Sequence, residues 1–400
     1  LVWHAFVCSP EEMGLPGQQY FAGTHMNPNV TWWEKSGPFI EWLNRCQFMM
    51  QQGLPFADVL FYYGDHVPNY TQLRGSDPAR VGAGYDYDVI TEEAILTRLS
   101  AKSGKLMLPD GVTYQLIVLP EREIISLPVL RKLRELARVG AVILGPKPTR
   151  ASGLTQHTKN DAEVRKIAAE LWDSGRVMVG KTAREVLLAR GFPPDFEGPS
   201  DQSAGLEYIH RRDGDADIYF VANRAKVKAT TICTFRVTGK VPELWNPVTG
   251  ERRLATAYEQ KEGRTTVPLD FAPAGSWFVV FRKPAAQHPA TTTTNARTFA
   301  PLAELTGAWT VRFDPKWGGP GTVEFDTLAN WTERPEPGIK FYSGTATYEK
   351  TFQLAESEIQ HSKSKIFLDL GTVRELAEVK VNSKSCGITW APPFRVDISA

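Results

Sequence analysis

The residues best suited to chemistry stand in one segment near the start of the chain, from Gly23 to Trp33. Imidazole and amide groups can hydrogen-bond hydroxyl groups, and an indole ring can stack on the C–H face of a sugar. The segment combines all three, which predicts a sugar-binding surface. The candidate substrate-binding residues are His4, at the end of the preceding apolar strand, and His25, Asn27, Asn29, Trp32 and Trp33.

The two indoles in this segment leave an alternative open. Trp32 and Trp33 are adjacent, so only one of them can face a pocket freely if a helix starts there. In the alternative interpretation, Trp33 belongs to the core and His25 hydrogen-bonds the backbone of a stiff loop.

Carboxylates are the next requirement, because hydrolysis of a glycosidic bond takes two of them. Glu11 and Glu12 stand in a loop without the apolar surroundings that would raise the pKa of a carboxyl group. Glu34 and Glu41 take helix positions and are expected to be exposed. Residues 1–53 hold no other acids. The catalytic residues are therefore left unknown, and we expect them upstream of residue 1.

The elements around this segment indicate how it is positioned. An apolar strand at 1–7, a long loop and a helix over 37–52 follow the plan of one unit of a (β/α)₈ barrel, in which the loop after the strand lies on the active face. Residues 1–53 are thus predicted to be the end of a truncated barrel. Both chain ends read as strands, so we expect the chain to be a fragment of a longer protein.

Residues 54–195 are predicted to form an α/β domain with a parallel sheet, because continuous apolar strands alternate with helices. Thr91 and Ser126 are the expected N-caps of two of the helices. The predicted strands are 57–63, 114–120 and 141–144, and the predicted helices are 91–99, 126–139, 160–173 and 182–190.

Chemistry within this α/β segment is weakly supported. Its glycine-rich stretch 82–88 lacks the glycine pattern of dinucleotide and phosphate loops, and Asp86 and Asp88 alone are a weak signal for a cation. The segment resembles class I glutamine amidotransferase folds, which carry a nucleophilic cysteine after a central strand. No cysteine stands anywhere in 54–195, so we interpret it as a non-catalytic domain of flavodoxin/amidotransferase-like type.

The remainder of the chain is predicted to be all-β. Residues 196–286 form a small antiparallel sandwich, with strands at 217–223, 231–237 and 276–281 and with Arg211 and Arg212 as turn and surface residues. Residues 287–298 form a linker. Residues 299–400 form a second, truncated β-domain, in which 338–348 is predicted as a strand together with 309–313, 346–352, 365–370 and 377–381.

Composition excludes several classes of function. A net charge of +1 favours neither nucleic acid nor an anionic membrane, and no apolar run is long enough to cross a bilayer. The cysteines form no Cys-x-x-Cys pair, which argues against a zinc or redox motif. They are Cys8, Cys46, Cys233 and Cys386.

Several ordered motifs resemble the C-terminal portion of the α-L-rhamnosidases of glycoside hydrolase family 106 and, more loosely, multidomain β-galactosidases. The resemblance covers nearly the whole chain, and the order of the motifs is more specific than any one of them. The motifs are Gly23-Thr24-His25, Thr31-Trp32-Trp33, Tyr62-Tyr63-Gly64-Asp65, Gly84-Tyr85-Asp86-Tyr87-Asp88, Leu108-Pro109-Asp110-Gly111, Leu144-Gly145-Pro146-Lys147-Pro148, Trp245-Asn246-Pro247-Val248-Thr249-Gly250 and Phe341-Tyr342-Ser343-Gly344-Thr345-Ala346.

This resemblance implies an inverting hydrolase of terminal α-L-rhamnose that uses a (β/α)₈ barrel and, in relatives, a bound Ca²⁺ whose ligands here are unknown. It also implies that 299–400 is a galactose-binding-like jelly roll. The expected partner is an oligo- or polysaccharide, and the expected location is secreted or periplasmic. The 400-residue piece alone is expected to be inactive. The alternative is a non-catalytic carbohydrate-binding assembly, and the sugar and the oligomeric state stay open.

Overall fold

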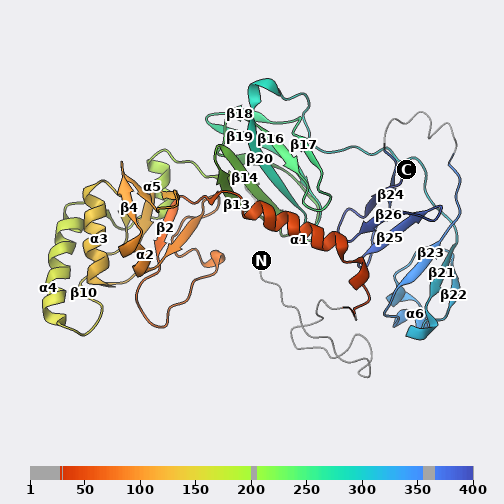
Figure 1. Ribbon diagram of the computed structural model, residues 1–400, viewed down its shortest axis with the longest axis horizontal. Coiled ribbons are helices and arrows are strands. Elements are labelled where there is room, and N and C mark those ends of the chain that lie inside the picture. Colours follow the sequence, from red (N-terminus) through yellow and green to blue (C-terminus); the bar gives the residue numbers. More distant parts are fainter. Residues whose placement is uncertain (1–27, 29, 200–204, 355–364, 400) are drawn as a thin grey trace. The chain divides into compact units, whose positions relative to one another are not determined.

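The computed structural model describes residues 28, 30–199, 205–354 and 365–399 (Figure 1). These fall into two compact units. One comprises the described parts of 1–44 and 297–400, and the other spans 45–296 without its undescribed residues. Each unit is described by itself below.

Helix α1 (Gly37–Met50) confirms the helix predicted after the aromatic segment. It ends before Gly53, whose φ of +55° falls in the left-handed region, and a Cβ at this position would lie 2.1 Å from the carbonyl oxygen of Arg212. Near its end Met49 packs with Ile218 and Phe278. The C-terminal part of α1 is therefore fixed to the 45–296 unit.

A five-stranded parallel sheet forms the first half of this unit, with the order β11-β9-β7-β2-β3. Every residue of β2 is buried, which explains its continuous apolar character. From β2 the chain adds β3 on one side of the sheet and then β7, β9 and β11 on the other, so the direction of strand order changes between β2 and β7. The strands are β2 (Val59–Tyr62), β3 (Tyr87–Ile90), β7 (Leu116–Val118), β9 (Ile143–Leu144) and β11 (Val177–Met178).

Helices cover both faces of this sheet (Figure 1). Leu60 and Tyr62 face a core that includes α2 (Glu92–Thr97), α3 (Leu127–Arg138) and α4 (His157–Ala168), which continues as a π-helical turn, Ala169–Asp173. Val59 and Phe61 face α5 (Ala183–Ala189). Smaller strands flank the sheet: β4 (Ser100–Lys102), β5 (Lys105–Met107), β6 (Thr113–Tyr114), β8 (Ile124–Ile125) and β10 (Arg150–Ala151).

The two predicted helix caps have different outcomes. The Thr91 side chain accepts a hydrogen bond from the backbone N–H of Ala94, which confirms it as the N-cap of α2. Ser126 stands at the N-cap position of α3 but makes no capping bond. Its hydroxyl instead donates to Glu92 Oε1 at 2.5 Å. The sequence prediction of a capping side chain was wrong there because a carboxylate from α2 competes for the hydroxyl.

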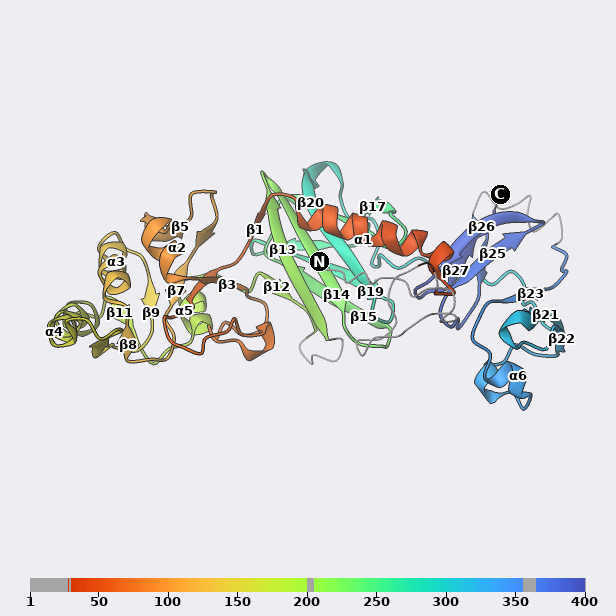
Figure 2. The same ribbon diagram turned by 60° about the horizontal axis from the view of Figure 1, so that its bottom comes forward.

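Two antiparallel sheets make up the second half of this unit, with the orders β1-β13-β14-β20-β16-β17 and β12-β15-β19-β18. Their side chains share one core, so they form a β-sandwich, and Figure 2 shows β13, β14 and β20 side by side. The strands are β1 (Leu54–Pro55), β12 (Phe196–Glu197), β13 (Leu206–Asp213), β14 (Ala216–Asn223), β15 (Ala229–Phe235), β16 (Lys240–Trp245), β17 (Arg252–Leu254), β18 (Glu259–Lys261), β19 (Arg264–Phe271) and β20 (Ser276–Pro284).

The segment predicted as a linker has no helix or strand between His288 and Ala296. It is nevertheless fastened to the sandwich by Asn295, which is buried. The Asn295 side chain accepts from the backbone N–H groups of Thr256 and Ala257 and donates to the carbonyl oxygens of Ala257 and Pro268, at 2.7–3.0 Å. The Asn295 side chain thus holds this segment, which has few large apolar residues, against the sandwich.

The C-terminal region contains three small antiparallel sheets, ordered β22-β21-β23, β24-β27 and β25-β26. The prediction of a strand over 338–348 was wrong in its first half, because α6 (Pro337–Lys340) is helical and the strand starts at Ala346. The strands are β21 (Trp309–Phe313), β22 (Thr322–Phe325), β23 (Ala346–Glu349), β24 (Phe367–Asp369), β25 (Ala377–Val381), β26 (Lys384–Thr389) and β27 (Arg395–Asp397).

The five-stranded parallel sheet, together with several antiparallel sheets, confirms the prediction of a mixed α/β and all-β multidomain fold. None of the helices in the described ranges is both long and apolar enough to cross a membrane.

Candidate functional site

The described part of the candidate sugar segment is a tight turn that carries both indoles. The backbone N–H of Trp33 donates to the carbonyl of Val30 at 3.1 Å, and that of Lys35 donates to the carbonyl of Trp32 at 3.0 Å. Val30 is buried, while Trp32 and Trp33 are half-buried. Both rings are thus partly accessible and stand on an ordered backbone. His4, His25, Asn27 and Asn29 lie outside the described residues.

The carboxylates near this turn do not form a catalytic pair. Glu34 and Glu41 are exposed, as the sequence predicts. Glu11 and Glu12 lie outside the described residues. Within the described part of 28–53 there is therefore no buried carboxyl group that could serve as a general acid with a raised pKa.

Aromatic side chains pack where α1 begins. The rings of Phe39 and Trp42 are stacked, with centroids 5.6 Å apart. Trp390, directly after β26, lies edge-on to both, at 5.2 Å from Phe39 and 5.4 Å from Trp42. We call these three rings the aromatic brace. Its indoles serve packing, which is why aromatic composition alone cannot identify a sugar platform.

Two other tryptophans of the C-terminal region differ in their surroundings, one in the core and one at the surface. Trp331 packs edge-on against Phe313 and Tyr342 and donates to the Tyr348 hydroxyl, so it belongs to the core. Trp317 is 38% exposed. Of these two indoles, only Trp317 presents an open ring.

The glycine-rich stretch at 82–88 is a structural loop that leads into β3. The Asp77 carboxylate accepts from the backbone N–H groups of Val81 and Gly82, at 2.9 and 2.8 Å. Gly84, with a φ of +86°, approaches Phe196 so closely that a Cβ would lie 2.4 Å from its carbonyl oxygen. The N–H groups of a phosphate loop would instead point to open space, so the geometry agrees with the rejection of such a loop.

The two aspartates of this stretch are already engaged. Asp86 accepts from the backbone N–H of Tyr87, and Asp88 accepts from the Tyr114 hydroxyl at 2.8 Å. No cluster of three or more histidine, cysteine, aspartate or glutamate side chains that could hold a metal occurs among the described residues. The described donor set therefore does not fit the calcium ion that the family resemblance implies.

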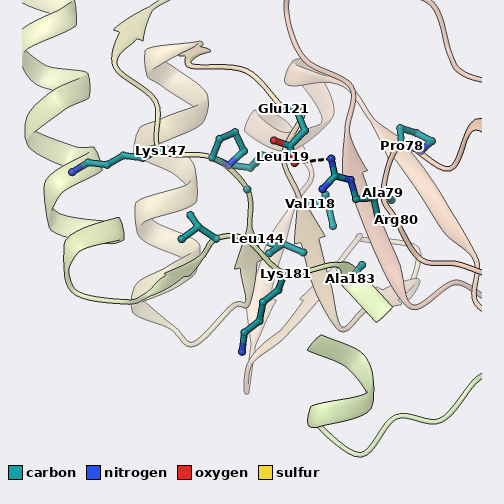
Figure 3. Close-up of a pocket in the computed structure, with 14 residues that line it drawn as sticks. Pro78, Ala79, Arg80, Val118, Leu119, Glu121, Leu144, Lys147, Lys181 and Ala183 are labelled. Carbon is teal, nitrogen blue, oxygen red and sulfur yellow. Dashed lines mark ion pairs between the residues drawn. The ribbon is translucent and has the colours of Figure 1, made fainter. Parts of the chain in front are cut away.

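A pocket of about 370 Å³ opens at the carboxyl ends of the parallel strands β7, β9 and β11 (Figure 3). This edge is where open α/β sheets bind ligands. Arg80 and Glu121 form an ion pair at 3.6 Å in it. The ammonium ends of Lys147 and Lys181 point away from that pair in Figure 3, and Lys147 is paired with Asp173.

None of the described residues that line this pocket is a cysteine, serine or threonine. At the place of the amidotransferase cysteine, after Leu119, the chain has Pro120, Glu121 and Arg122. The pocket has the volume for a small molecule but lacks the cysteine that amidotransferase chemistry needs.

Unpartnered polar atoms lie beside this edge, on the last residue of β2 and in the loop that follows it. Tyr62 Oη, Asp65 Oδ2 and His66 Nδ1 are buried without a hydrogen-bond partner among the described residues. Tyr62 and Asp65 line a recess of about 10 Å³, which is at the lower limit of the roughly 10–15 Å³ that one water molecule needs. Burial and the Asp65 charge raise the pKa of Tyr62, so its hydroxyl stays protonated. Sequence reasoning missed this cluster, since Tyr62 and Asp65 stood out there only as part of a family motif.

A buried charged cluster joins the parallel-sheet region to the sandwich. His210 on β13 is completely enclosed, with Nδ1 at 2.9 Å from Asp195 Oδ2 and Nε2 at 3.2 Å from Asp217 Oδ1. Arg236 reaches across to Asp58, directly before β2, with contacts of 2.9 and 2.8 Å to the two carboxylate oxygens. These contacts tie the two halves of the 45–296 unit together.

The environment of His210 fixes its protonation state. A neutral imidazole has a single N–H, but both ring nitrogens of His210 face a carboxylate. Burial alone would lower the pKa of His210, and the carboxylates of Asp195 and Asp217 outweigh burial and raise it. Burial alone would raise the pKa of Asp217, but hydrogen bonds from His210 and Lys240 hold it well below its usual range. Both the raised pKa and the two facing carboxylates favour an imidazolium in this cluster.

The two arginines predicted as turn and surface residues lie on β13, which corrects the prediction of a turn, while Arg212 is exposed as predicted. Arg211 donates from Nε to the carbonyl of Gln52 at 2.7 Å and from Nη2 to the carbonyl of Gly53 at 2.8 Å. Arg212 donates from Nε to Asp217 at 3.0 Å. Their partners lie either on a distant segment or on the next strand, which local sequence reasoning does not reveal.

Comparison with known proteins identifies the family. The model of glycoside hydrolase family 106, described as alpha-L-rhamnosidase, matches residues 1–260. The "Putative beta-glucuronidase" of Formosa agariphila is 33% identical over 282 residues, which are 70% of this chain and 24% of that protein. The solved structure of a rhamnosidase from Novosphingobium sp. PP1Y superposes with a TM-score of 0.83 at 31% identity, covering 94% of this chain and 36% of that one.

The chain thus spans about a quarter and about a third of the lengths of these two relatives. The family match covers well over half of the chain, and the structural match extends it into the C-terminal region. The chain belongs to glycoside hydrolase family 106, the α-L-rhamnosidases.

Proposed function

We propose that this chain serves in a glycoside hydrolase that releases terminal α-L-rhamnose from oligo- or polysaccharides with inversion at the anomeric carbon. Membership of family 106 over residues 1–260 carries this proposal. The similarity to a rhamnosidase structure over 94% of the chain supports it.

The proposed sugar site is the segment around the turn of Trp32 and Trp33. Residues 1–53 form the end of a (β/α)₈ barrel, where one indole stacks on the sugar ring. Because Glu34 and Glu41 are exposed, the two catalytic carboxylates come from elsewhere in the enzyme. One protonates the leaving oxygen and the other activates a water molecule on the opposite face of the sugar. In this proposal His4, His25, Asn27 and Asn29 hydrogen-bond the sugar hydroxyls.

The other regions have supporting roles in this proposal. The parallel-sheet region is non-catalytic, since it lacks a cysteine nucleophile. The C-terminal region is a galactose-binding-like jelly roll. The isolated 400-residue chain should accordingly release no sugar, whereas the full-length enzyme should.

Hydrolysis of an aryl α-L-rhamnoside by the full-length enzyme tests the proposal. Proton NMR during the first turnovers should show the β-anomer of rhamnose, as inversion requires. Trp32→Ala and Trp33→Ala should have different effects on KM. Loss of the indole that stacks on the sugar should raise KM about tenfold, a typical loss for one stacking contact. Sugar binding without release would favour the non-catalytic alternative. If the full-length enzyme showed no binding and no release, both proposals would be refuted.

A second candidate substrate is a β-D-glucuronide, which the name of the Formosa agariphila relative suggests. The same assay with an aryl β-D-glucuronide separates the two. A kcat/KM at least a hundredfold higher for one glycoside assigns the sugar.

Calcium and location are proposals from the family resemblance alone. We propose that the full-length enzyme binds Ca²⁺ outside the described residues and acts outside the cytoplasm, secreted or periplasmic, where polysaccharides are met. Chelation followed by calcium titration checks the first, with a fall in thermal midpoint expected on chelation. Fractionation of the source cells checks the second.

A further inference from the structure

The turn that carries Trp32 and Trp33 is held by residues more than 300 positions away in the sequence. Lys35, at the end of this turn, pairs with Glu378 on β25, with 3.6 Å between Nζ and Oε2. Both side chains are 28% exposed, so solvent screens this pair less than it screens a pair on the open surface. Glu378 also lies 3.5 Å from Lys380.

The aromatic brace fixes the helix that follows the turn. Phe39 and Trp42 are three residues apart and so share a face of α1. Trp390 lies edge-on to both, at interplanar angles of 84° and 61°, which is a favoured geometry for aromatic pairs. The start of α1 can therefore not rotate about its axis without breaking two ring contacts.

Packing is what Trp390 contributes. Its Nε1 is buried and finds no hydrogen-bond partner among the described residues. A phenylalanine at this position would keep a ring against Phe39 and Trp42, whereas an alanine would remove it. This difference provides a matched pair of variants.

We propose that Trp390 and Glu378 are positioning residues for the sugar site. They act through Lys35 and the start of α1 to hold the indoles of Trp32 and Trp33 at the angle that a sugar ring needs. This inference rests on the proposed function. The C-terminal β region would thus contribute to substrate recognition without contacting the sugar.

Steady-state kinetics of the full-length enzyme on an aryl α-L-rhamnoside test the proposal. Trp390→Ala should raise KM about tenfold and change kcat less than twofold, because a stacking contact made equally in ground and transition states affects KM alone. Trp390→Phe should stay within twofold of the wild type. Glu378→Gln should raise KM twofold to threefold. Trp317→Ala, on an exposed indole of the same region outside the brace, is the control and should leave KM unchanged.

A combined variant separates positioning from general stability. In a Trp32→Ala/Trp33→Ala background the Trp390→Ala change should no longer affect KM, because it acts through the missing indoles. An undiminished effect in that background would overturn the proposal, and so would an unchanged KM in Trp390→Ala itself.

Amide hydrogen exchange tests the brace independently of activity. The amides of Trp33, Lys35 and Ser36 donate within the turn and should exchange at least tenfold faster in Trp390→Ala than in Trp390→Phe. Equal exchange would refute the brace even if the enzyme proved inactive. A wild type that neither cleaves nor binds rhamnosides would instead refute the proposed function and leave the exchange result standing.

Discussion

Replacing His210 by glutamine tests whether the buried imidazole carries a positive charge in the folded protein. The substitution keeps a side chain of similar polarity but removes the cation between Asp195 and Asp217. Both carboxylates are almost completely enclosed, at 2% and 7% exposure. Without the cation between them, the two buried carboxylates should repel each other.

The magnitude follows from the partners that remain. Removing one member of a buried ion pair costs about 3–5 kcal/mol. Asp217 keeps Arg212 and Lys240, each at 3.0 Å, and Asp195 keeps the Tyr219 hydroxyl at 2.8 Å. These contacts place the cost at the low end, about 3 kcal/mol in the free energy of unfolding.

The pH dependence distinguishes a cationic from a neutral imidazole. The folded pKa of His210 lies above its ordinary value of 6.5. A raised pKa gives stability that is fully present below about 6.5 and is lost as pH rises through the folded pKa. The gap between wild type and His210→Gln should therefore narrow as the solution becomes more alkaline.

Urea denaturation of the 400-residue chain between pH 6 and pH 10, followed by circular dichroism, measures both effects. His157→Gln, on an exposed histidine at the start of α4, is the control and should change the free energy of unfolding by less than about 0.5 kcal/mol. An His210→Gln variant as stable as the control, or a gap that does not depend on pH, would refute the assignment of an imidazolium. The Nδ1 and Nε2 chemical shifts of His210 would then report a neutral ring.

Three further stability predictions use the same urea assay. Tyr219→Phe should lower the free energy of unfolding by about 1–3 kcal/mol, because the Tyr219 hydroxyl donates to Asp195. Tyr62→Phe should be neutral or stabilising, since the Tyr62 hydroxyl has no partner among the described residues. A loss of stability in Tyr62→Phe would instead reveal a buried water. Asn295→Ala should cost about 2–4 kcal/mol, because it removes four hydrogen bonds. The stability of Asn295→Asp should lie between those of the wild type and Asn295→Ala. Gly84→Ala should cost well over about 3 kcal/mol, because its Cβ would collide with Phe196. Gly82→Ala has a similar φ but would only touch the Arg184 side chain at 3.5 Å, so it should cost about 1–2 kcal/mol. Equal costs for the two variants would contradict this reasoning.

Local signals were enough to predict the elements of the parallel sheet. The run 57–63 is apolar throughout because β2 is buried on both faces. Thr91 begins α2 and Gly53 follows α1, because a capping hydroxyl and a left-handed backbone are requirements of the next few residues alone. Such preferences act over one turn of chain, and one sequence suffices to read them.

Contacts between distant segments could not be predicted in this way. β1 pairs with β13 across more than 150 residues, with Leu54 opposite Arg212. Ser126 gives its hydroxyl to Glu92 instead of capping α3. In both cases the residue type indicates which kind of partner is required, a strand or a hydrogen-bond acceptor. Which segment provides that partner depends on the tertiary fold.

The candidate sugar site shows the same division in its aromatic residues. An indole satisfies a core and a sugar platform equally well by type, since both use its apolar face. Trp390 and Trp331 prove to be packed between other rings, while Trp317 is 38% exposed and Trp32 and Trp33 are half-buried. A count of tryptophans therefore says nothing about sugar binding until the accessibility of each ring is known. Partial burial on a hydrogen-bonded turn is what favours Trp32 and Trp33, because a stacking ring must be open on one face and held still on the other.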